Sequence, residues 1–512
     1  MKKIIIVPIL IIIIYIVLLF NKIWIEEILL LFLLPLIISF IIIGVITLII
    51  NTFKKRSIKK YIVSSIIAAS IIQLFLLFFV LWSIYPRQFT GDQIKKDIDY
   101  AKVFMEDVHP DLYAVISKDK LDYKIDSIKR TIPESLAEVE AYKVLNTIFS
   151  NIKDAHTKLT LNNYLRRGAI FFRKVPPYRL RVINDKIFVL KNYSKRKKIP
   201  VGSQIIEINS KTASECLIEL SRLVSHETKN NLQANLQLPM IWGMWNNFEN
   251  FTLTYRTPEG KTETIVSSSG LFSNISFLWD FTGFFLKNYS FEILNDDVGY
   301  INIKAFNNLD KCKKFFTSTF GEIRKENINN IVIDLRGNQG GNEEVSLELM
   351  QYLSPVDFRS FDTIKLKISR ERINRRSIDT TKFIPGSLVL EKNSMTLLRK
   401  NDLHYNGKCY LLTSGYTFST ALDFAAMFRC YNVGEIVGTE TGGKTVSFGA
   451  PCNFILPETG LEMKVSQKRF FNVCGEESKR GLIPDYKVEN SIQDDINGID
   501  RALEFILSKI DK

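Results

Sequence analysis

Histidine and cysteine, the usual ligands of zinc and other transition metals, are scarce in this chain. Its 512 residues include four histidines and six cysteines, and no cysteines have the CxxC spacing or another metal-binding spacing. The sequence therefore predicts no metal site and no cofactor. It leaves the state of the cysteines open, with Cys452 and Cys474 as one candidate disulfide and buried free thiols as the alternative.

Charge is missing from long stretches near the N-terminus. Ile28–Ile50 and Tyr61–Tyr85 carry no charge, and Ile4–Phe20 is interrupted only by Pro8. A membrane span needs roughly 20 apolar residues, so the sequence predicts three N-terminal membrane-spanning helices. The first run also fits a signal peptide, but no small-residue cleavage site follows it. The lack of ionisable residues in the second and third runs argues against a transporter.

The charges around these runs predict their orientation. Lys2 and Lys3 precede the first run, Glu26 and Glu27 follow it, and the basic segment 54–60 separates the second run from the third. Positive loops stay in the cytoplasm. We therefore expect a multi-pass protein of the cell (inner) membrane, in contact with the lipid bilayer. Its N-terminus would be cytoplasmic and its remainder extracytoplasmic, either periplasmic or extracellular.

The net charge of +14 does not point to nucleic acid. Part of this charge belongs to the loops between the predicted spans. A further basic run, Lys195–Lys198, stands on a predicted surface turn, where it is typical of a solvated face or of attraction to anionic lipid. We therefore expect no nucleic-acid partner.

The chain after residue 87 passes from helical to β to α/β patterns. Apolar residues recur at helical spacing from 92 to 160, and short β runs with one helix, Ala213–Leu223, occupy about 175–270. Asn330–Leu335 is typical of a strand buried on both faces, and a helical pattern follows at Glu343–Leu353. A second strand–turn–helix unit begins at Cys409. Two such units place both turns at one edge of the same sheet.

Ser419 stands where the second of these strands has ended and a helix begins. A hydroxyl at a helix N-terminus meets free backbone N–H groups and the positive end of the helix dipole. Both features favour an oxyanion, so the position suits a nucleophile in acyl transfer. The same position also suits an ordinary N-cap, which is the commoner use of serine there.

Three other segments carry candidate chemistry. The pair Gly340-Gly341 after the first strand allows a sharp turn and a close backbone approach to another group. Lys444 follows two glycines and could act as a base if burial lowers its pKa. His156 lies in a predicted turn after a helix, where its ring could project into a cleft. Each feature alone more often has a structural or solvent-exposed role.

Together these segments resemble the C-terminal-processing (tail-specific) peptidases and their tricorn-core relatives, over roughly residues 95–510. Ile333–Gly341 resembles the family's DLRxNxGG turn, and Thr417–Ala421 resembles its nucleophile segment. Gly481–Asp485 matches a later landmark, and Val201–Asn209 resembles the core of a PDZ domain. After the three transmembrane helices, the resemblance implies an α/β (α+β) ClpP/crotonase-like peptidase core. A small helical subdomain and a PDZ-like β module would accompany it.

The resemblance also implies roles for the site residues. Ser419 would attack the scissile carbonyl, with the backbone N–H groups of Gly340 and Thr420 as the oxyanion hole. The family has two kinds of base, and this sequence carries a candidate for each. Lys444 falls on the lysine position of the tail-specific branch. His156, in Asp154-Ala155-His156-Thr157, falls on the histidine position of the tricorn-like branch, with Ala in place of Gly, and is slightly favoured.

In the histidine branch a distant acid orients the base. Glu476 or Glu477 would take that role, although both stand farther from Gly481 than the acid does in relatives. Another departure is Leu422, where the family has an acidic residue three positions after the nucleophile. In the PDZ-like segment Ser203 and Ser210 replace Asp and Gly. These replacements weaken the expectation that the module captures a C-terminal carboxylate, while strand addition to a sheet edge remains open.

The sequence thus predicts four domains and two functions. The domains are a three-span membrane anchor at 1–87, a helical subdomain at 88–165, a PDZ-like β module at 170–285 and an α/β serine peptidase catalytic domain at 290–512. The leading function is a membrane-anchored serine endopeptidase that cleaves unfolded or C-terminally exposed protein or peptide substrates. The alternative is a catalytically inactive peptide-binding or sensing protein on the same scaffold.

Overall fold

The computed structural model describes residues 87–160, 173–194, 198–271, 288–295, 297–376, 384–475 and 477–511. Contacts divide the chain into two compact units, Met1–Tyr85 and Pro86–Lys512, and every described residue lies in the second.

Helices dominate the first described part of the chain. Its elements are β1 (Gln88–Thr90), α5 (Gly91–Val108), α6 (Lys118–Thr131), β2 (Ser135–Ala137), α7 (Glu138–Ser150) and β3 (Lys158–Thr160). A capping box between Thr90 and Gln93 starts α5. Ile94, Ile98 and Met105 then form its buried face, as their helical spacing predicts.

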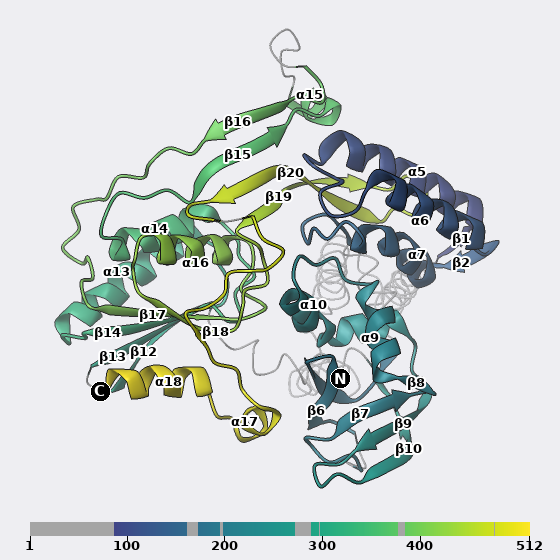
Figure 1. Ribbon diagram of the computed structural model, residues 1–512, viewed down its shortest axis with the longest axis horizontal. Coiled ribbons are helices and arrows are strands. Elements are labelled where there is room, and N and C mark those ends of the chain that lie inside the picture. Colours follow the sequence, from purple (N-terminus) through teal and green to yellow (C-terminus); the bar gives the residue numbers. More distant parts are fainter. Residues whose placement is uncertain are drawn as a thin grey trace, which may run out of the picture. The chain divides into compact units, whose positions relative to one another are not determined.

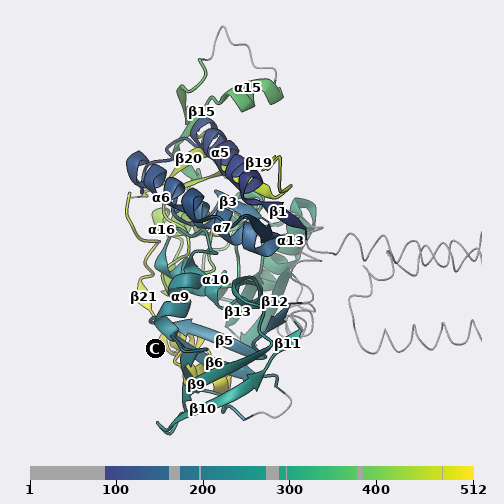
Figure 2. The ribbon, with the colours of Figure 1, turned by 90° about the vertical axis from the view of Figure 1, so that its right-hand side faces the viewer.

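A mostly antiparallel β region follows. Its elements are β4 (Lys174–Val175), β5 (Tyr178–Ile183), β6 (Lys186–Asn192), β7 (Gln204–Ile208), β8 (Lys211–Thr212), α9 (Ala213–Ser221), α10 (Lys229–Leu236), α11 (Pro239–Trp245), β9 (Asn250–Arg256), β10 (Thr262–Ser268) and β11 (Gly270–Leu271). Strands β5 to β10 form a six-stranded sheet of order β10-β9-β7-β6-β5, with β8 paired to β7. Helices α9 and α10 lie between this sheet and the helical elements α5 to α7 (Figure 2). The predicted strands and the helix at 213 are confirmed, whereas α10 and α11 were not predicted.

The rest of the chain is α/β. Its elements are β12 (Tyr289–Asn295), β13 (Val298–Ile303), α13 (Leu309–Lys325), β14 (Asn330–Asp334), α14 (Glu343–Leu353), β15 (Phe361–Lys367), α15 (Arg370–Arg376), β16 (Leu388–Lys392), β17 (Lys408–Thr413), α16 (Thr420–Cys430), β18 (Glu435–Gly438), β19 (Val446–Ile455), β20 (Glu462–Asn472), β21 (Tyr486–Lys487), α17 (Ile492–Asn497) and α18 (Arg501–Ile510).

A six-stranded sheet of order β12-β13-β14-β17-β18-β21 forms the core of this part. Its strands run parallel except for β12. All five residues of β14 are buried, because α13, α14 and α16 cover one face of the sheet and α18 covers the other (Figure 1). The carboxyl ends of β14 and β17 therefore lie side by side, and the predicted arrangement of the two turns is confirmed.

A second sheet connects this core with the helical elements. It contains β16, β15, β20 and β19 in that order. The short strand β3 pairs antiparallel with β20 along the edge that faces away from β19, at the opposite end of that edge from β15. Glu462, Met463 and Lys464 of β20 lie opposite Thr160, Leu159 and Lys158 of β3. The pairing brings the segment just before β3 onto the α/β part of the chain.

No helix in the described ranges is long and apolar enough to cross a membrane. This finding corrects the prediction of three membrane-spanning helices, and with it the predicted multi-pass location in the cell membrane and the predicted contact with lipid. The longest described helix, α5, has 18 residues and carries Lys95, Lys96 and Asp97, whereas a span needs roughly 20 apolar residues. The three hydrophobic runs on which the prediction was based lie outside the described residues.

The cysteines also differ from the candidate pairing. Cys474, in the turn after β20, forms a disulfide with Cys430 at the end of α16, and Cys452 is free. Cys216, Cys312 and Cys409 are buried free thiols. The disulfide ties the C-terminal end of α16 to the loop that follows β20.

Asp97 joins the helical elements to the hairpin between β19 and β20. Its buried carboxylate accepts hydrogen bonds from the backbone N–H groups of Glu458 and Thr459 and from the Thr459 hydroxyl. We expect Asp97→Ala to lower the free energy of unfolding by about 2–4 kcal/mol, because it leaves two buried donors of Thr459 and the half-buried N–H of Glu458 without a partner. Chemical denaturation of the full chain measures this change.

Asp92→Ala is the matched control on the same helix. The Asp92 side chain is 83% exposed and pairs with Lys95, so its removal should cost less than about 1 kcal/mol. Equal losses for the two variants would contradict a structural role for the buried carboxylate.

Candidate active site

Ser419 occupies a sharp turn between β17 and α16. Its backbone has φ 54° and ψ −132°, a conformation that residues other than glycine rarely adopt. Its hydroxyl makes no capping hydrogen bond to α16. Instead Ser419 Oγ lies 3.1 Å from His156 Nε2. The arrangement departs from an ordinary N-cap, and strained residues of this kind concentrate at functional sites.

The glycine turn after β14 is hydrogen-bonded directly to the segment around Ser419. The Phe418 N–H donates to the Asn338 carbonyl (3.1 Å), and the Thr420 hydroxyl donates to the Gly341 carbonyl (2.9 Å). Asn338 is fully buried, and its amide donates to the Ile303 carbonyl at the end of β13. The turn at Asn338–Gly341 is thus hydrogen-bonded both to β13 and to the two neighbours of Ser419.

Asp334 and Arg336 of the same motif anchor the turn. Arg336 reaches both Asp334, at the end of β14, and Asp500, which precedes α18, with nitrogen–oxygen distances of 2.7 Å. The two-pronged guanidinium matches these carboxylates geometrically. Asp334 and Arg336 therefore hold the sheet edge to the start of α18 through Asp500.

The two predicted oxyanion donors differ in their present partners. Thr420 is the first residue of α16, and the N–H groups of a first helical turn have no partner within the helix. The Gly340 N–H, by contrast, donates to the Asn338 side chain (2.8 Å). Gly340 packs so closely on the nucleophile turn that an added Cβ would lie 2.8 Å from Ser419 Cβ. Donation from Gly340 to a substrate would require exchange of its present hydrogen bond.

His156 comes from the segment between α7 and β3. Its backbone N–H donates to Asp154 Oδ1 (2.8 Å), and its ring stacks on Phe418 with centroids 4.8 Å apart. The Asp154 carboxylate also accepts from Ser466 Oγ (2.6 Å) and from His109 Nε2 (3.2 Å). Asp154 is fully buried and fully hydrogen-bonded, so it fixes the backbone that carries His156.

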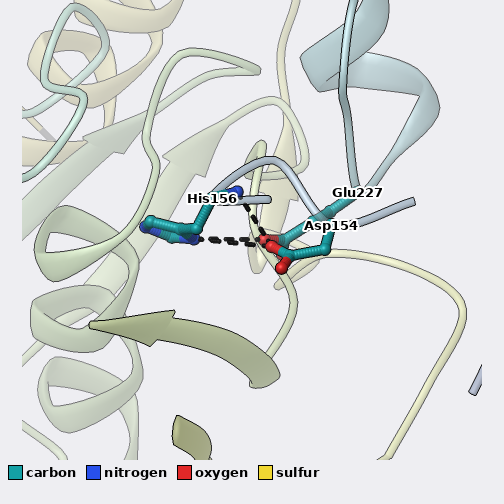
Figure 3. Close-up of side chains that lie close together, drawn as sticks. All are labelled: Asp154, His156 and Glu227. Carbon is teal, nitrogen blue, oxygen red and sulfur yellow. Dashed lines mark hydrogen bonds and ion pairs between the residues drawn. The ribbon is translucent and has the colours of Figure 1, made fainter. Parts of the chain in front are cut away.

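The other ring nitrogen of His156, Nδ1, faces an acid that the sequence did not reveal. Glu227 lies between α9 and α10, and its Oε1 is 3.6 Å from His156 Nδ1 (Figure 3). Its side chain is 3% exposed. Glu227 stands 192 positions before Ser419 in a segment that matches no motif of the family, so no local pattern could have identified it.

Burial and charge act in opposite directions on these groups. Burial disfavours the protonated ring of His156, but the facing Glu227 and the nearby Asp154 outweigh it and raise the pKa of His156. Burial likewise raises the pKa of Glu227, with His156 opposing it. Burial opposes ionisation of Asp154 too, but the hydrogen bonds from His109 and Ser466 and the nearby histidine charges lower its pKa.

Lys444 and Glu477, the other two predicted site residues, make contacts of a different kind. The backbone N–H of Lys444 donates to Glu227 Oε2 (3.2 Å), so Lys444 joins this cluster through its main chain. Glu477 is 68% exposed and pairs with Arg469. Among the described residues, the carboxylates within 4 Å of the His156 ring are Asp154 and Glu227. The structure thus does not bring Glu477 to His156, and Glu476 lies outside the described residues.

Asp154, His156 and Glu227 offer ligand atoms within 4.8 Å of one another. Both oxygens of Asp154 are already engaged by protein donors, and His156 Nε2 faces the Ser419 hydroxyl. The donor set therefore suits an acid–base relay better than the binding of a metal ion.

Comparisons with known proteins give one family match and several structural likenesses. Residues 297–488 match a family model described as Peptidase family S41. A crystal structure of mature CPAF aligns with 14% identity over 82% of this chain and 96% of that chain, with a TM-score of 0.61. The structure of mature CPAF complexed with lactacystin aligns with 14% identity over 82% of this chain and 97% of that chain, with a TM-score of 0.60. Likenesses at this identity show the fold alone. Among curated proteins none matches. The family match and the fold confirm the resemblance inferred from the motifs.

Gly340→Ala tests the close packing of the glycine turn on the nucleophile. The added Cβ would lie 2.8 Å from the Phe418 carbonyl oxygen and from Ser419 Cβ, at a backbone φ of +99° that disfavours alanine. We expect labelling of Ser419 by a fluorophosphonate probe to slow by about 100-fold or more, because small displacements of a nucleophile are costly. Time-resolved mass spectrometry measures the labelling rate.

Gly337→Ala is the control in the same turn. Its Cβ would meet only the Lys304 side chain, at 3.6 Å. An equal loss in both variants would show that the turn tolerates no alanine at all, rather than that Gly340 must approach Ser419.

Proposed function

We propose that this chain, a serine-type peptidase with a family S41 domain, is an endopeptidase that cleaves unfolded or C-terminally exposed proteins through an acyl-enzyme at Ser419. The observation that carries the proposal is the contact of Ser419 Oγ with His156 Nε2 at 3.1 Å, in a turn that leaves the hydroxyl without a capping role.

His156 would act first as general base. Its Nε2 would take the proton of Ser419 Oγ as the oxygen attacks the scissile carbonyl, and the resulting imidazolium would give that proton to the leaving amine. The carbonyl oxygen would gain negative charge at the N-terminus of α16. There the Thr420 N–H, with the Gly340 N–H after exchange from Asn338, would stabilise it. Water activated by His156 would then hydrolyse the acyl-enzyme.

The restricted access to the site favours an extended substrate. The His156 side chain is 17% exposed, and Ser419 and Phe418 are half-buried between the glycine turn and the histidine segment. An unstructured chain or a free C-terminus can enter such a site as an extended strand, whereas a loop held in a folded protein would first have to change its conformation. We therefore propose unfolded or C-terminally exposed chains as the substrate class.

Substitution of the two side chains in contact separates catalysis from binding. We expect Ser419→Ala to abolish cleavage of an unfolded reporter such as casein, and His156→Ala to lower the rate by about 10³-fold or more. Lys444→Ala should stay within about tenfold of the wild type, because its contact with the cluster uses the backbone. Reporter cleavage at neutral pH by the full chain measures all three.

The same series tests the alternative of an inactive peptide-binding protein. A folded wild type that binds the reporter but neither cleaves it nor reacts with the fluorophosphonate would replace the peptidase proposal with that alternative.

The rate should also depend on pH in a defined direction. His156 accepts a proton only when its ring is neutral, and the surrounding carboxylates raise its pKa above the usual 6.5. We therefore expect kcat/KM to fall as pH decreases, with a slope of about one and a midpoint above 6.5. A midpoint well below that value would contradict His156 as the base.

A further inference from the structure

His156 Nδ1 and Glu227 Oε1 are buried polar atoms that lack a hydrogen-bond partner within the described residues. They face each other at 3.6 Å, as Figure 3 shows. Buried polar atoms without partners are rare in folded proteins and call for a physical explanation. A movement of about half an ångström would bring this pair to hydrogen-bond distance, and catalytic hydrogen bonds are often long in unliganded structures.

The position of Glu227 is fixed by the loops on either side. Its second oxygen, Oε2, accepts the backbone N–H of Lys444 (3.2 Å). The next residues dock on the same turn, since the Thr228 hydroxyl donates to the Gly442 carbonyl (3.0 Å) and the Asn230 amide to the Glu440 carbonyl (3.0 Å). One carboxylate oxygen is thus held by the backbone, and the other points at the His156 ring.

The other acids near the site are engaged elsewhere. Asp154 Oδ1 lies 3.9 Å from His156 Nδ1 and already accepts the His156 backbone N–H. Its other oxygen accepts hydrogen bonds from Ser466 and His109. Glu477 pairs with Arg469 at the surface. Glu227 is therefore the carboxylate with a free oxygen directed at the ring.

We propose that Glu227 is the positioning residue that orients His156, by accepting a hydrogen bond from Nδ1–H and so leaving Nε2 free to take the proton of Ser419. This inference rests on the proposed function. The proton on Nδ1 stays there throughout the cycle. The proton from Ser419 passes to Nε2 and then to the leaving amine, while the carboxylate of Glu227 stabilises the transient imidazolium.

Other charged groups bear on the ring as well. Asp154 and Glu227 favour the protonated ring, and Lys158, in β3, opposes it. Asp423, on α16, is also affected by His156 and Glu227, and burial raises its pKa to about 7. At the residue before Glu227, burial lowers the pKa of His226 to about 4, which keeps that ring neutral.

Kinetics of Glu227→Gln provide the first test. The amide keeps the shape of the side chain and can still accept the Lys444 N–H, but its NH2 group favours the wrong tautomer of His156. We expect kcat to fall by about 10²- to 10⁴-fold, while KM for the reporter changes little. In the pH profile of kcat/KM for the variant, the midpoint of the fall at low pH should move to lower pH, because a carboxylate that raises the pKa of His156 is gone.

Two comparison variants sharpen this test. Glu249→Gln, an exposed acid of the same β region, should leave kinetics and pH profile unchanged. Glu477→Gln examines the acid expected from the sequence. The proposal is overturned if Glu477→Gln loses the activity and Glu227→Gln keeps it, or if Glu227→Gln lowers the rate without moving the pH profile. Loss of wild-type activity on treatment with EDTA would also overturn it, since the cluster would then hold a metal ion.

A second measurement does not depend on activity. With four histidines in the chain, histidine-selective 13C labelling of the full-length Ser419→Ala and Ser419→Ala/Glu227→Gln proteins gives few signals, and His156→Gln assigns the one of interest. We expect the pKa of His156 to fall by about one to three units when Glu227 becomes Gln. An unchanged pKa would refute the inference even if the peptidase is active. A fall of this size would support it even if the reporter assay fails.

Discussion

The pairing of β3 with β20 is the constraint on which the candidate site depends. His156 and Ser419 are 263 positions apart, and they meet because three residues of β3 align antiparallel with β20 directly after the histidine segment. Thr157 and Asp154 reinforce this pairing through hydrogen bonds with the backbone and hydroxyl of Ser466. A shift of one residue in this register would turn the side chains of β3 to the opposite face of the sheet and would displace the histidine segment that precedes it.

Each part of the described chain supplies one member of the proposed catalytic set. The α/β core supplies Ser419 and the glycine turn, the helical elements supply His156, and the β region supplies Glu227. Their contact buries charged groups, and burial of this kind is costly unless every group finds a partner. The site is therefore complete only when all three parts are docked, which links its chemistry to the integrity of the whole described chain.

Strain and rigidity are combined around the nucleophile. The unusual backbone of Ser419 persists because its neighbours are held on both sides, Phe418 by Asn338 and Thr420 by Gly341. The disulfide between Cys430 and Cys474 secures the other end of α16. A helix fixed at both ends keeps its N-terminal N–H groups in a constant direction, and this constancy is what electrostatic stabilisation of an oxyanion requires.

Local patterns determined the elements of the core and the candidate nucleophile. Periodicity predicted β14, α14 and the paired turns, since a strand buried on both faces and an amphipathic helix leave a clear trace in sequence. The motifs around Gly340 and Ser419 were equally local. The same apolarity that predicts a buried strand also suggested membrane spans in the first 85 residues, a prediction that the described helices did not bear out.

The partners of the candidate nucleophile were decided by tertiary structure alone. His156 and Lys444 were both open as bases, and only the docking of β3 on β20 set the His156 ring beside Ser419 while Lys444 contacts the cluster through its backbone. Glu227 and the Cys430–Cys474 bond left no trace in local sequence. The physical reason is that these contacts join residues 44 to 263 positions apart, so they arise from the packing of whole elements rather than from any local pattern.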